Sequence, residues 1–309
     1  MTGARATWLS LGEGRTPLVR APRLSETLGL ELQLKCEHLN PTGSFKDRGM
    51  AVAVERAADR GVETVVCAST GNTAASAATY AARAGLRAIV LTPEGATADA
   101  KRAQARAAGA HLFEVRGTFD DALRLCRELG ERDGFMLVNS LNPDRIEGQR
   151  TVVGEIVDQL GGIPDVIALP YGGGGNVSAV AAGCEEAGIS PALVVGEAAA
   201  RPTTFASAIR IAEPAHEERV GKLIRDGRLT VVPLSEAQLR DAWASLARVE
   251  GVFCEPASAA GIAALAELGL TGTAVCVVTG HGLKDPGAVE GSEATVVDAS
   301  VDAVLEALA

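Results

Sequence analysis

Short runs of β-branched and aliphatic residues alternate along the chain with longer, alanine-rich stretches whose apolar residues recur at helical spacing. The short runs predict buried strands, and the longer stretches predict amphipathic helices. Strands that alternate with helices build βαβ units, and such units form parallel sheets. The pattern therefore predicts an α/β fold.

Most of the predicted strands end in turns that are polar or rich in glycine. The strands are predicted at 32–36, 64–69, 88–92, 111–115, 136–139, 166–170, 193–197, 230–233 and 274–279. Helices are predicted at 73–83, 98–108, 120–131, 147–160, 178–187 and 301–309. Ligands of open α/β sheets bind outside the carboxyl ends of the strands, so functional residues are expected in those turns.

The 309-residue chain is 47% hydrophobic but only 3% aromatic, so its core must be built mainly from small aliphatic residues. Its net charge of -10 argues against a nucleic-acid partner, because phosphate backbones are bound by basic surfaces. No apolar run is long enough to span a bilayer, and residues 1–14 lack a signal-peptide pattern. The six Cys and four His have no metal-binding spacing, so no metal site is predicted. Scattered cysteines indicate a reducing, cytoplasmic compartment.

The loop 40–49 reads Asn-Pro-Thr-Gly-Ser-Phe-Lys-Asp-Arg-Gly and follows the first predicted strand. Its first residues favour a turn, and Ser44 is predicted to cap a helix whose first turn contains Lys46. The positive end of that helix would lower the pKa of Lys46. An amine that loses its proton easily is what imine chemistry requires. For this loop alone, a solvated surface lysine is the alternative.

Two further loops present backbone amides at the start of a helix. The loop 69–73 reads Ser-Thr-Gly-Asn-Thr, and its hydroxyls and amides could bind a carboxylate or phosphate, or could simply cap the helix. The loop 170–176 reads Pro-Tyr-Gly-Gly-Gly-Gly-Asn. Amides without neighbouring Cβ atoms can turn inward on one oxyanion, and phosphate is the expected ligand. This loop has neither the ending of a Walker loop nor the spacing of a dinucleotide fold.

A fourth loop, 277–285, reads Val-Val-Thr-Gly-His-Gly-Leu-Lys-Asp. Thr279 places a hydroxyl at a strand end. His281 could be a general base, but a structural role in a glycine-flanked turn is favoured. A lysine at a helix start, two anion sites and this hydroxyl indicate an aldehyde-bearing phosphorylated cofactor such as pyridoxal phosphate (PLP), together with a small anionic substrate.

The same loops resemble the threonine synthase family of fold-type II PLP enzymes, over nearly the whole chain and in family order. The matching segments are 13–18 (EGRTPL), 40–49 (NPTGSFKDRG), 68–76 (ASTGNTAAS), 138–149 (VNSLNPDRIEGQ), 206–211, 255–260 (EPASAA) and 278–285 (VTGHGLKD). A lone SFKDRG would indicate only the wider fold type, whereas the set is much more specific.

The resemblance implies a role for each matching residue. Lys46 would hold the cofactor as a Schiff base and then move protons during the reaction, and Phe45 would flank the cofactor. Cofactor contacts are implied for Asn72 at the 3-oxygen, for Thr279 at the ring nitrogen, and at the phosphate for Gly172, Gly173, Gly174, Gly175 and Asn176. Substrate contacts are implied for Ser69, Thr70 and Thr73 at the carboxylate, and for Asn139, Ser140 and Arg145 at the substrate phosphate.

The implied reaction converts O-phospho-L-homoserine and water to L-threonine and phosphate. Three departures bear on the substrate. Gly173 stands where these synthases usually have an asparagine that contacts the substrate phosphate, Ala212-Glu213 replaces a Gly-Asn pair, and the chain is short for the family. A relative acting on another activated amino acid, such as a cysteate-synthase-like enzyme or a threonine/serine dehydratase, is one alternative. A non-catalytic binding protein of the same fold is another.

The resemblance also implies the architecture. Two α/β domains would enclose the cofactor in the cleft between them. Residues 1–38 and 139–309 would form the larger domain, which binds the cofactor, and residues 39–138 a smaller, mobile domain that closes over the substrate. A homodimer is the family expectation, and no membrane association is expected.

Overall fold

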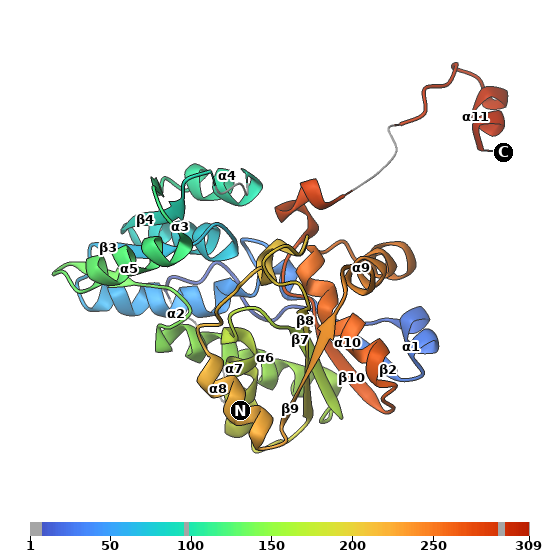
Figure 1. The fold of residues 1–309 in the computed structure, drawn as a ribbon, viewed down its shortest axis with the longest axis horizontal. Coiled ribbons are helices and arrows are strands. Elements are labelled where there is room, and N and C mark those ends of the chain that lie inside the picture. The colour runs from blue at the N-terminus through green and yellow to red at the C-terminus, as the bar shows by residue number, and fades with distance from the viewer. Residues whose placement is uncertain (1–7, 96–98, 290–293, 309) are drawn as a thin grey trace.

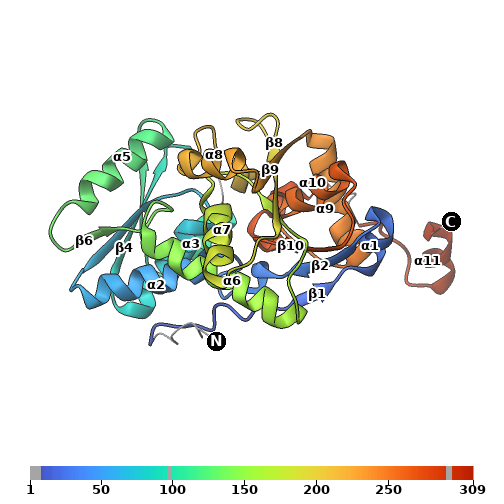
Figure 2. The same cartoon turned by 90° about the horizontal axis from the view of Figure 1, so that it is seen from below.

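The computed structural model describes residues 8–95, 99–289 and 294–308 and contains two sheets (Figures 1 and 2). The larger sheet has the strand order β1-β2-β10-β7-β8-β9 and the smaller one β5-β4-β3-β6. All neighbouring strands are parallel except β1, which pairs antiparallel with β2 at the edge. The prediction of an α/β fold with mostly parallel sheets is confirmed.

The strands are β1 (Leu18–Arg20), β2 (Glu31–Lys35), β3 (Thr64–Ala68), β4 (Arg87–Pro93), β5 (His111–Val115), β6 (Phe135–Leu137), β7 (Val166–Pro170), β8 (Ala192–Ala198), β9 (Leu229–Leu234) and β10 (Thr273–Val277). Each predicted strand is present within a few residues. The three-residue edge strand β1 was not predicted, because such a short segment has no measurable alternation.

The α-helices are α1 (Pro22–Leu28), α2 (Lys46–Asp59), α3 (Asn72–Ala84), α4 (Asp99–Ala107), α5 (Phe119–Gly130), α6 (Pro143–Leu160), α7 (Gly175–Ala187), α8 (Glu217–Arg225), α9 (Glu236–Glu250), α10 (Ala260–Leu268) and α11 (Val301–Leu308). Among the 3-10 helices are η1 (Glu37–Leu39), η2 (Ser207–Ile209) and η4 (Gly282–Lys284). Ala98 and Ala309, at the ends of two predicted helices, lie outside the described residues. The start predicted for the fourth helix, Glu147, is wrong, because Asn142 caps the helix and Pro143 begins it.

Helices cover both faces of each sheet. On the larger sheet, one face packs against α1, α9 and α10 and the other against α6, α7 and α8. On the smaller sheet, Val65 and Cys67 of β3 face α2, α3 and α4, whereas Val66 and Ala68 face α5. This alternation places a continuous apolar strand between two helical layers. In the described part of the chain, no helix is long and apolar enough to cross a membrane.

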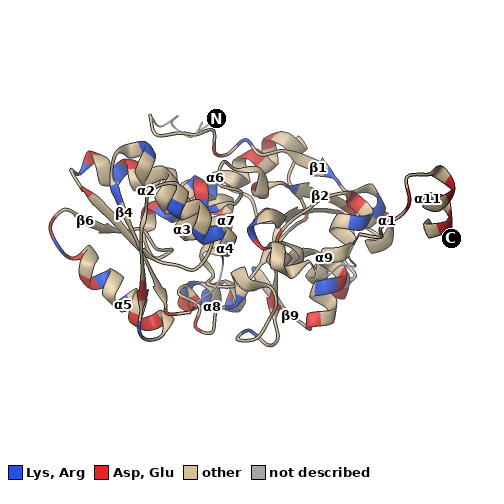
Figure 3. Cartoon of the chain, turned by 90° about the horizontal axis from the view of Figure 1, so that it is seen from above, with Lys and Arg blue, Asp and Glu red and all other residues tan. Residues whose placement is uncertain are grey.

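Charged residues of both signs are interspersed over the outer helices (Figure 3). All six cysteines are buried as free thiols, and burial raises the pKa of Cys67 and Cys276 to about 12. These thiols behave as small apolar side chains, as predicted for Cys67 and Cys276.

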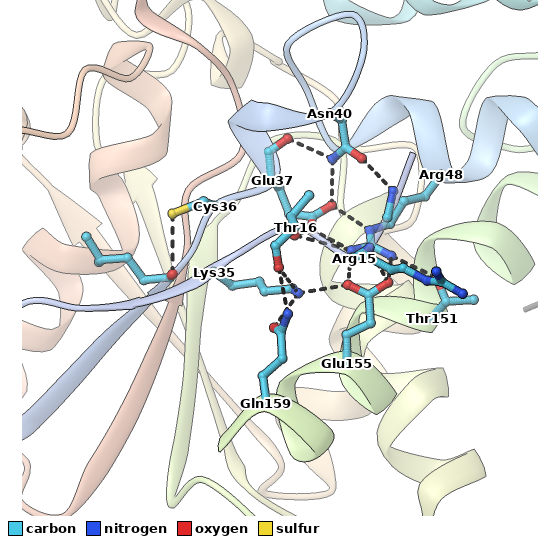
Figure 4. Close-up of polar contacts among 12 residues, drawn as sticks. Arg15, Thr16, Lys35, Cys36, Glu37, Asn40, Arg48, Thr151, Glu155 and Gln159 are labelled. Carbon is cyan, nitrogen blue, oxygen red and sulfur yellow. Dashed lines mark hydrogen bonds and ion pairs between the residues drawn. The ribbon is translucent and has the colours of Figure 1, made fainter. Parts of the chain in front are cut away.

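A buried ionic network joins α2 to the larger sheet (Figure 4). Glu155 of α6 accepts hydrogen bonds from Lys35 Nζ of β2 at 2.8 Å and from Arg48 Nη1 and Nη2 of α2 at 2.7 and 2.6 Å. Arg48 also donates to both carboxylate oxygens of Glu37, at 2.6 and 2.7 Å. Because Lys35 and Arg48 are almost fully buried, their charges depend on these carboxylates.

Replacing Glu155 by Ala is expected to lower the free energy of unfolding by about 3 kcal/mol, because two buried cations lose a partner. Desolvation raises the pKa of Glu155, but hydrogen bonds from Arg48 and Lys35 outweigh it and lower that pKa to about 2. The stabilisation is therefore present above the unfolded-state pKa near 4.5 and is lost as the pH falls from about 4.5 to about 2. Urea unfolding at pH 7 and pH 3 measures both effects. Glu128→Ala, which breaks an exposed ion pair with Arg124, should change the free energy of unfolding by less than about 0.5 kcal/mol.

Candidate active site

Helix α2 begins at Lys46, so this lysine stands in the first turn of the helix, as predicted. The prediction that Ser44 caps the helix is wrong. Phe45 occupies the cap position without a side-chain hydrogen bond, and the buried Ser44 hydroxyl has no partner within residues 8–95, 99–289 and 294–308. The backbone there pairs instead with the loop after β10, since Phe45 N donates to Thr279 O at 3.0 Å and Ser44 bridges Gly280. This pairing holds Lys46 next to the Thr279 loop.

The pKa of the Lys46 amine is lowered, so it loses its proton more easily than an ordinary lysine. Burial lowers its pKa to about 7, and the charge of Arg145 contributes in the same direction, against an opposing effect of Glu255. The direction matches the prediction, but burial and Arg145 are the causes that the structure identifies. The Nζ atom lies 4.3 Å from the centroid of the Phe45 ring. A substantial fraction of Lys46 is therefore neutral near pH 7, which a nucleophilic amine requires.

Two glycines bring α2 and α6 into backbone contact. A Cβ atom on Gly49 would lie 2.4 Å from the carbonyl oxygen of Arg145, and one on Gly148 would lie 2.1 Å from that of Arg48. Both positions therefore require glycine. The close crossing places Arg145, in the first turn of α6, beside the start of α2. Neither glycine was assigned a role from the sequence, although both lie in matching motifs.

Arg145 is a buried cation without a carboxylate partner among the described residues. Its side chain is 0% exposed, and Nη1 donates to Val138 O at 2.8 Å. Its Nε and Nη2 atoms have no hydrogen-bond partner in the described part of the chain. Burial lowers its pKa to about 10, so the guanidinium remains charged at neutral pH. Two unsatisfied donors on a buried charge are a binding site for an anion.

The loop after β3 contains the residues to which the resemblance assigns the substrate carboxylate and the cofactor 3-oxygen, namely Ser69, Thr70, Asn72 and Thr73. Ser69 Oγ accepts hydrogen bonds from the amides of Gly71 at 3.0 Å and Ala74 at 3.3 Å, so this hydroxyl caps α3. Asn72, 6% exposed, donates through Nδ2 to both carboxylate oxygens of Glu255 at 3.0 Å, and its buried Oδ1 has no partner among the residues that the structure describes. The hydroxyls of Thr70 and Thr73 are on partly buried residues beside it.

The glycine loop connects β7 to α7, which begins at Gly175 after Gly174 in the left-handed region (φ 81°). The segment before α8 lines this loop. His216 N donates to Gly173 O at 3.1 Å, and its ring Nε2 lies 2.9 Å from Ser140 O, so His216 links the glycine loop through its backbone to the segment after β6 through its imidazole. Asn176 Nδ2 is buried without a partner. Backbone amides at this helix start suit a phosphate.

Two other predicted site residues, Asn139 and Thr279, form hydrogen bonds within the protein. Asn139 exchanges two hydrogen bonds with the backbone of Ala68, at 2.9 and 2.8 Å, and so ties the segment after β6 to the end of β3. Thr279, 2% exposed, lies 3.1 Å from Ser258 Oγ, which also accepts from the amides of Thr279 and Gly280. Ser258 was not singled out from the sequence, and only its place in the matching segment 255–260 marked it. His281 Nδ1 accepts from Leu283 N and caps η4, in agreement with the structural role favoured for it.

The residues present fit PLP. Several polar atoms of the predicted site residues and of Ser44 are buried and have no hydrogen-bond partner among the described residues, namely Ser44 Oγ, Asn72 Oδ1, Asn176 Nδ2, and Nε and Nη2 of Arg145. Buried polar atoms without partners are rare in folded proteins and indicate a site for a ligand. The Asn176 Nδ2 donor would suit the cofactor phosphate, whereas the Arg145 donors would remain for a second anion. The glycine loop, with amides and no side chains, would take the cofactor phosphate, and Lys46 would take its aldehyde.

Comparison with known proteins agrees with this chemistry. The family model for "Pyridoxal-phosphate dependent enzyme" matches residues 9–280. Threonine synthase of Mycobacterium leprae is 46% identical over 323 residues, which cover 96% of this chain and 89% of that protein. Threonine synthase of Synechocystis sp. is 42% identical over 325 residues, which cover 97% of this chain and 85% of that protein.

Solved structures share the fold. A fungal L-serine ammonia-lyase from Rhizomucor miehei is 26% identical, with a TM-score of 0.74 over 86% of this chain and 93% of that chain. Maize serine racemase is 24% identical, with a TM-score of 0.76 over 87% of this chain and 88% of that chain, a likeness of fold alone. Fold, site and similarity over nearly the full length lead to one conclusion: the chain belongs to the pyridoxal-phosphate dependent enzymes and, among them, to the threonine synthase family.

Proposed function

We propose that this enzyme is a PLP-dependent lyase that converts O-phospho-L-homoserine and water to L-threonine and phosphate. The observation that carries the proposal is Arg145, a buried guanidinium beside the start of the helix that bears Lys46, with two donors that have no partner among the described residues. A phosphorylated substrate would satisfy those donors. The resemblance of the chain to threonine synthases of several organisms supports the same reaction.

When bound, PLP would supply an electron sink that stabilises negative charge at the substrate Cα. The protein groups would supply orientation and proton transfer. Ser69, Thr70 and Thr73 would hold the α-carboxylate, and Lys46, neutral in part at pH 7, would remove the Cα proton. Asn139, Ser140 and Arg145 would hold the phosphate, with Arg145 stabilising its charge as the bond to Cγ breaks.

The test is a product assay. Protein loaded with PLP is incubated separately with O-phospho-L-homoserine, O-phospho-L-serine and L-threonine, and phosphate, amino acids and keto acids are measured. Threonine and phosphate from phosphohomoserine in equal amounts are expected. Turnover of phosphoserine or deamination of threonine in their place would assign the cleft to one of the alternative reactions, and no turnover of any substrate would favour a binding protein.

Gly173 tests how the substrate phosphate is held. A Cβ atom there would meet only Ile211 Cδ1, at an ordinary 3.5 Å, so a side chain fits. Gly173→Asn is expected to lower KM for O-phospho-L-homoserine about fivefold, because it adds a hydrogen-bond donor for a charged group. Steady-state kinetics measure this effect. Gly174→Ala is the control, since φ is 81° and the new Cβ would lie 3.0 Å from His216 Cβ, so this variant should lose stability. An unchanged or higher KM in Gly173→Asn would place the substrate phosphate elsewhere.

We also propose the domain division at residues 39 and 138, a homodimer and a cytoplasmic location. The separate sheets, with β3 to β6 in one and the remaining strands in the other, support the division.

Exposed apolar side chains at Leu39, Phe253 and Leu283 support self-association. The buried free thiols suit a reducing compartment. Light scattering of the purified protein measures its oligomeric state.

A further inference from the structure

Helix α4 packs on α3 at the smaller sheet (Figure 1) and also contacts η4, which follows β10 of the larger sheet. Ala105 anchors α4 in the apolar core below. Two side chains make the contact across the cleft. Lys101 Nζ lies 3.2 Å from Ser207 Oγ, 3.4 Å from Glu255 Oε2 and 3.9 Å from Asp285 Oδ2. Gln104 accepts a hydrogen bond from Lys284 Nζ at 2.6 Å.

Lys101 and Glu255 form a buried ion pair, with exposures of 2% and 1%. Each charge depends in part on the other, because a buried charge without a partner is strongly destabilising. Asp285 also lies 3.9 Å from Lys101, and Lys284 also interacts electrostatically with Glu255. Lys101 belongs to α4, whereas Glu255 belongs to the segment before α10, far away in the sequence. The pair therefore forms only while α4 is docked across the cleft.

Glu255 continues the contact toward the cofactor site. Its carboxylate accepts hydrogen bonds from Asn72 Nδ2, and its backbone N donates to Gly280 O at 2.9 Å. A Cβ atom on Gly280 would lie 2.2 Å from Glu255 Oε1, so this glycine is needed for the carboxylate to fit. The carboxylate thus holds the Nδ2 end of the Asn72 carboxamide, while Oδ1 is buried and has no partner in the part of the chain that the structure describes.

We propose that Lys101 and Glu255 are positioning residues that couple the docking of helix α4 to the orientation of Asn72 at the cofactor. When α4 is docked, Lys101 balances the charge of Glu255, and Glu255 holds the Asn72 carboxamide in one orientation. When α4 lifts, the carboxylate loses its ion pair with Lys101 and is free to reorient toward Lys284 or another donor, so Asn72 loses its fixed orientation. The proposal depends on the assignment of Asn72 to the cofactor and not on the identity of the substrate.

The experiment uses the PLP-loaded protein and two measurements. Hydrogen–deuterium exchange of the peptide that contains α4 measures docking, and absorption, fluorescence and dissociation of the bound cofactor measure the environment of Asn72. Lys101→Met, which keeps the length of the side chain, is expected to speed exchange in α4 and to weaken PLP binding about fivefold. Arg106→Met removes an exposed charge from the same helix and should change neither measurement.

A double-mutant cycle tests the coupling itself. Asn72→Ala should weaken PLP binding, and adding Lys101→Met to Asn72→Ala should weaken it little further, because the carboxamide through which Lys101 acts is gone. Glu255→Gln keeps an acceptor for Asn72 Nδ2, so it should speed exchange in α4 with a smaller effect on the cofactor. Additive effects of Lys101→Met and Asn72→Ala, or fast exchange in α4 with an unchanged cofactor spectrum, would overturn the coupling. Neither measurement requires turnover, so failure of the proposed reaction would leave this test intact.

Discussion

Replacement of Lys46 by Ala is expected to abolish threonine formation, with a loss of rate of about 10⁴-fold or more. The lysine is the one residue proposed both to hold the cofactor and to move protons, and its pKa of about 7 matches both tasks. The variant should still bind PLP reversibly through the glycine loop, Asn72 and Thr279. It should also lack the visible absorption of the covalently held cofactor, which a spectrum of the purified protein would show.

The lowered pKa of Lys46 adds a dependence on pH. Uptake of PLP by the cofactor-free protein needs the neutral amine, so its rate should rise with pH, reach half its maximum near pH 7 and level off only at higher pH. Lys284→Met is the matched control, since burial lowers the pKa of Lys284 to about 8, yet its Nζ donates to Thr42 O and to Gln104. That variant should keep the covalent absorption band. A Lys46→Ala protein that still forms threonine at the normal rate would contradict the assignment.

The sequence predicted those parts of the site in which residue type and position suffice. Lys46 was placed at a helix start because the segment Asn-Pro-Thr-Gly shortly before it favours a turn. Four consecutive glycines join a strand to the first residue of a helix, and glycines without Cβ atoms favour a loop whose amides can turn toward a ligand. The strands were found because buried parallel strands are continuous apolar runs with turn residues at their ends.

The parts that the sequence did not predict depend on contacts between distant segments. Gly49 and Gly148 are needed only because α2 and α6 cross at backbone distance. Ser258 contacts Thr279, and His216 contacts Ser140, across long stretches of chain. Local patterns carry no information on such pairs. The expected cap at Ser44 failed for the same reason, because pairing with the loop after β10 determines the backbone there.

The replacement of Arg145 by Met is expected to separate function from stability. Turnover of O-phospho-L-homoserine should fall about 100-fold, because the phosphate loses its charged partner as it leaves. The free energy of unfolding should stay the same or rise by about 1 to 3 kcal/mol, since a buried guanidinium with two unsatisfied donors is replaced by an apolar side chain of similar length. Kinetics and urea unfolding of the same preparation measure both quantities.

The control for Arg145→Met is Arg56→Met. Arg56 forms ion pairs with Asp144 and Glu147 of α6. Arg56→Met should have the opposite effects, with a modest loss of stability and normal turnover, because Arg56 is partly exposed and pairs with two carboxylates. If Arg145→Met instead lost stability and kept full turnover, the guanidinium would be a structural element of the α2–α6 crossing. The substrate phosphate would then be held without it, and the cleft would lose its main argument for a phosphorylated substrate.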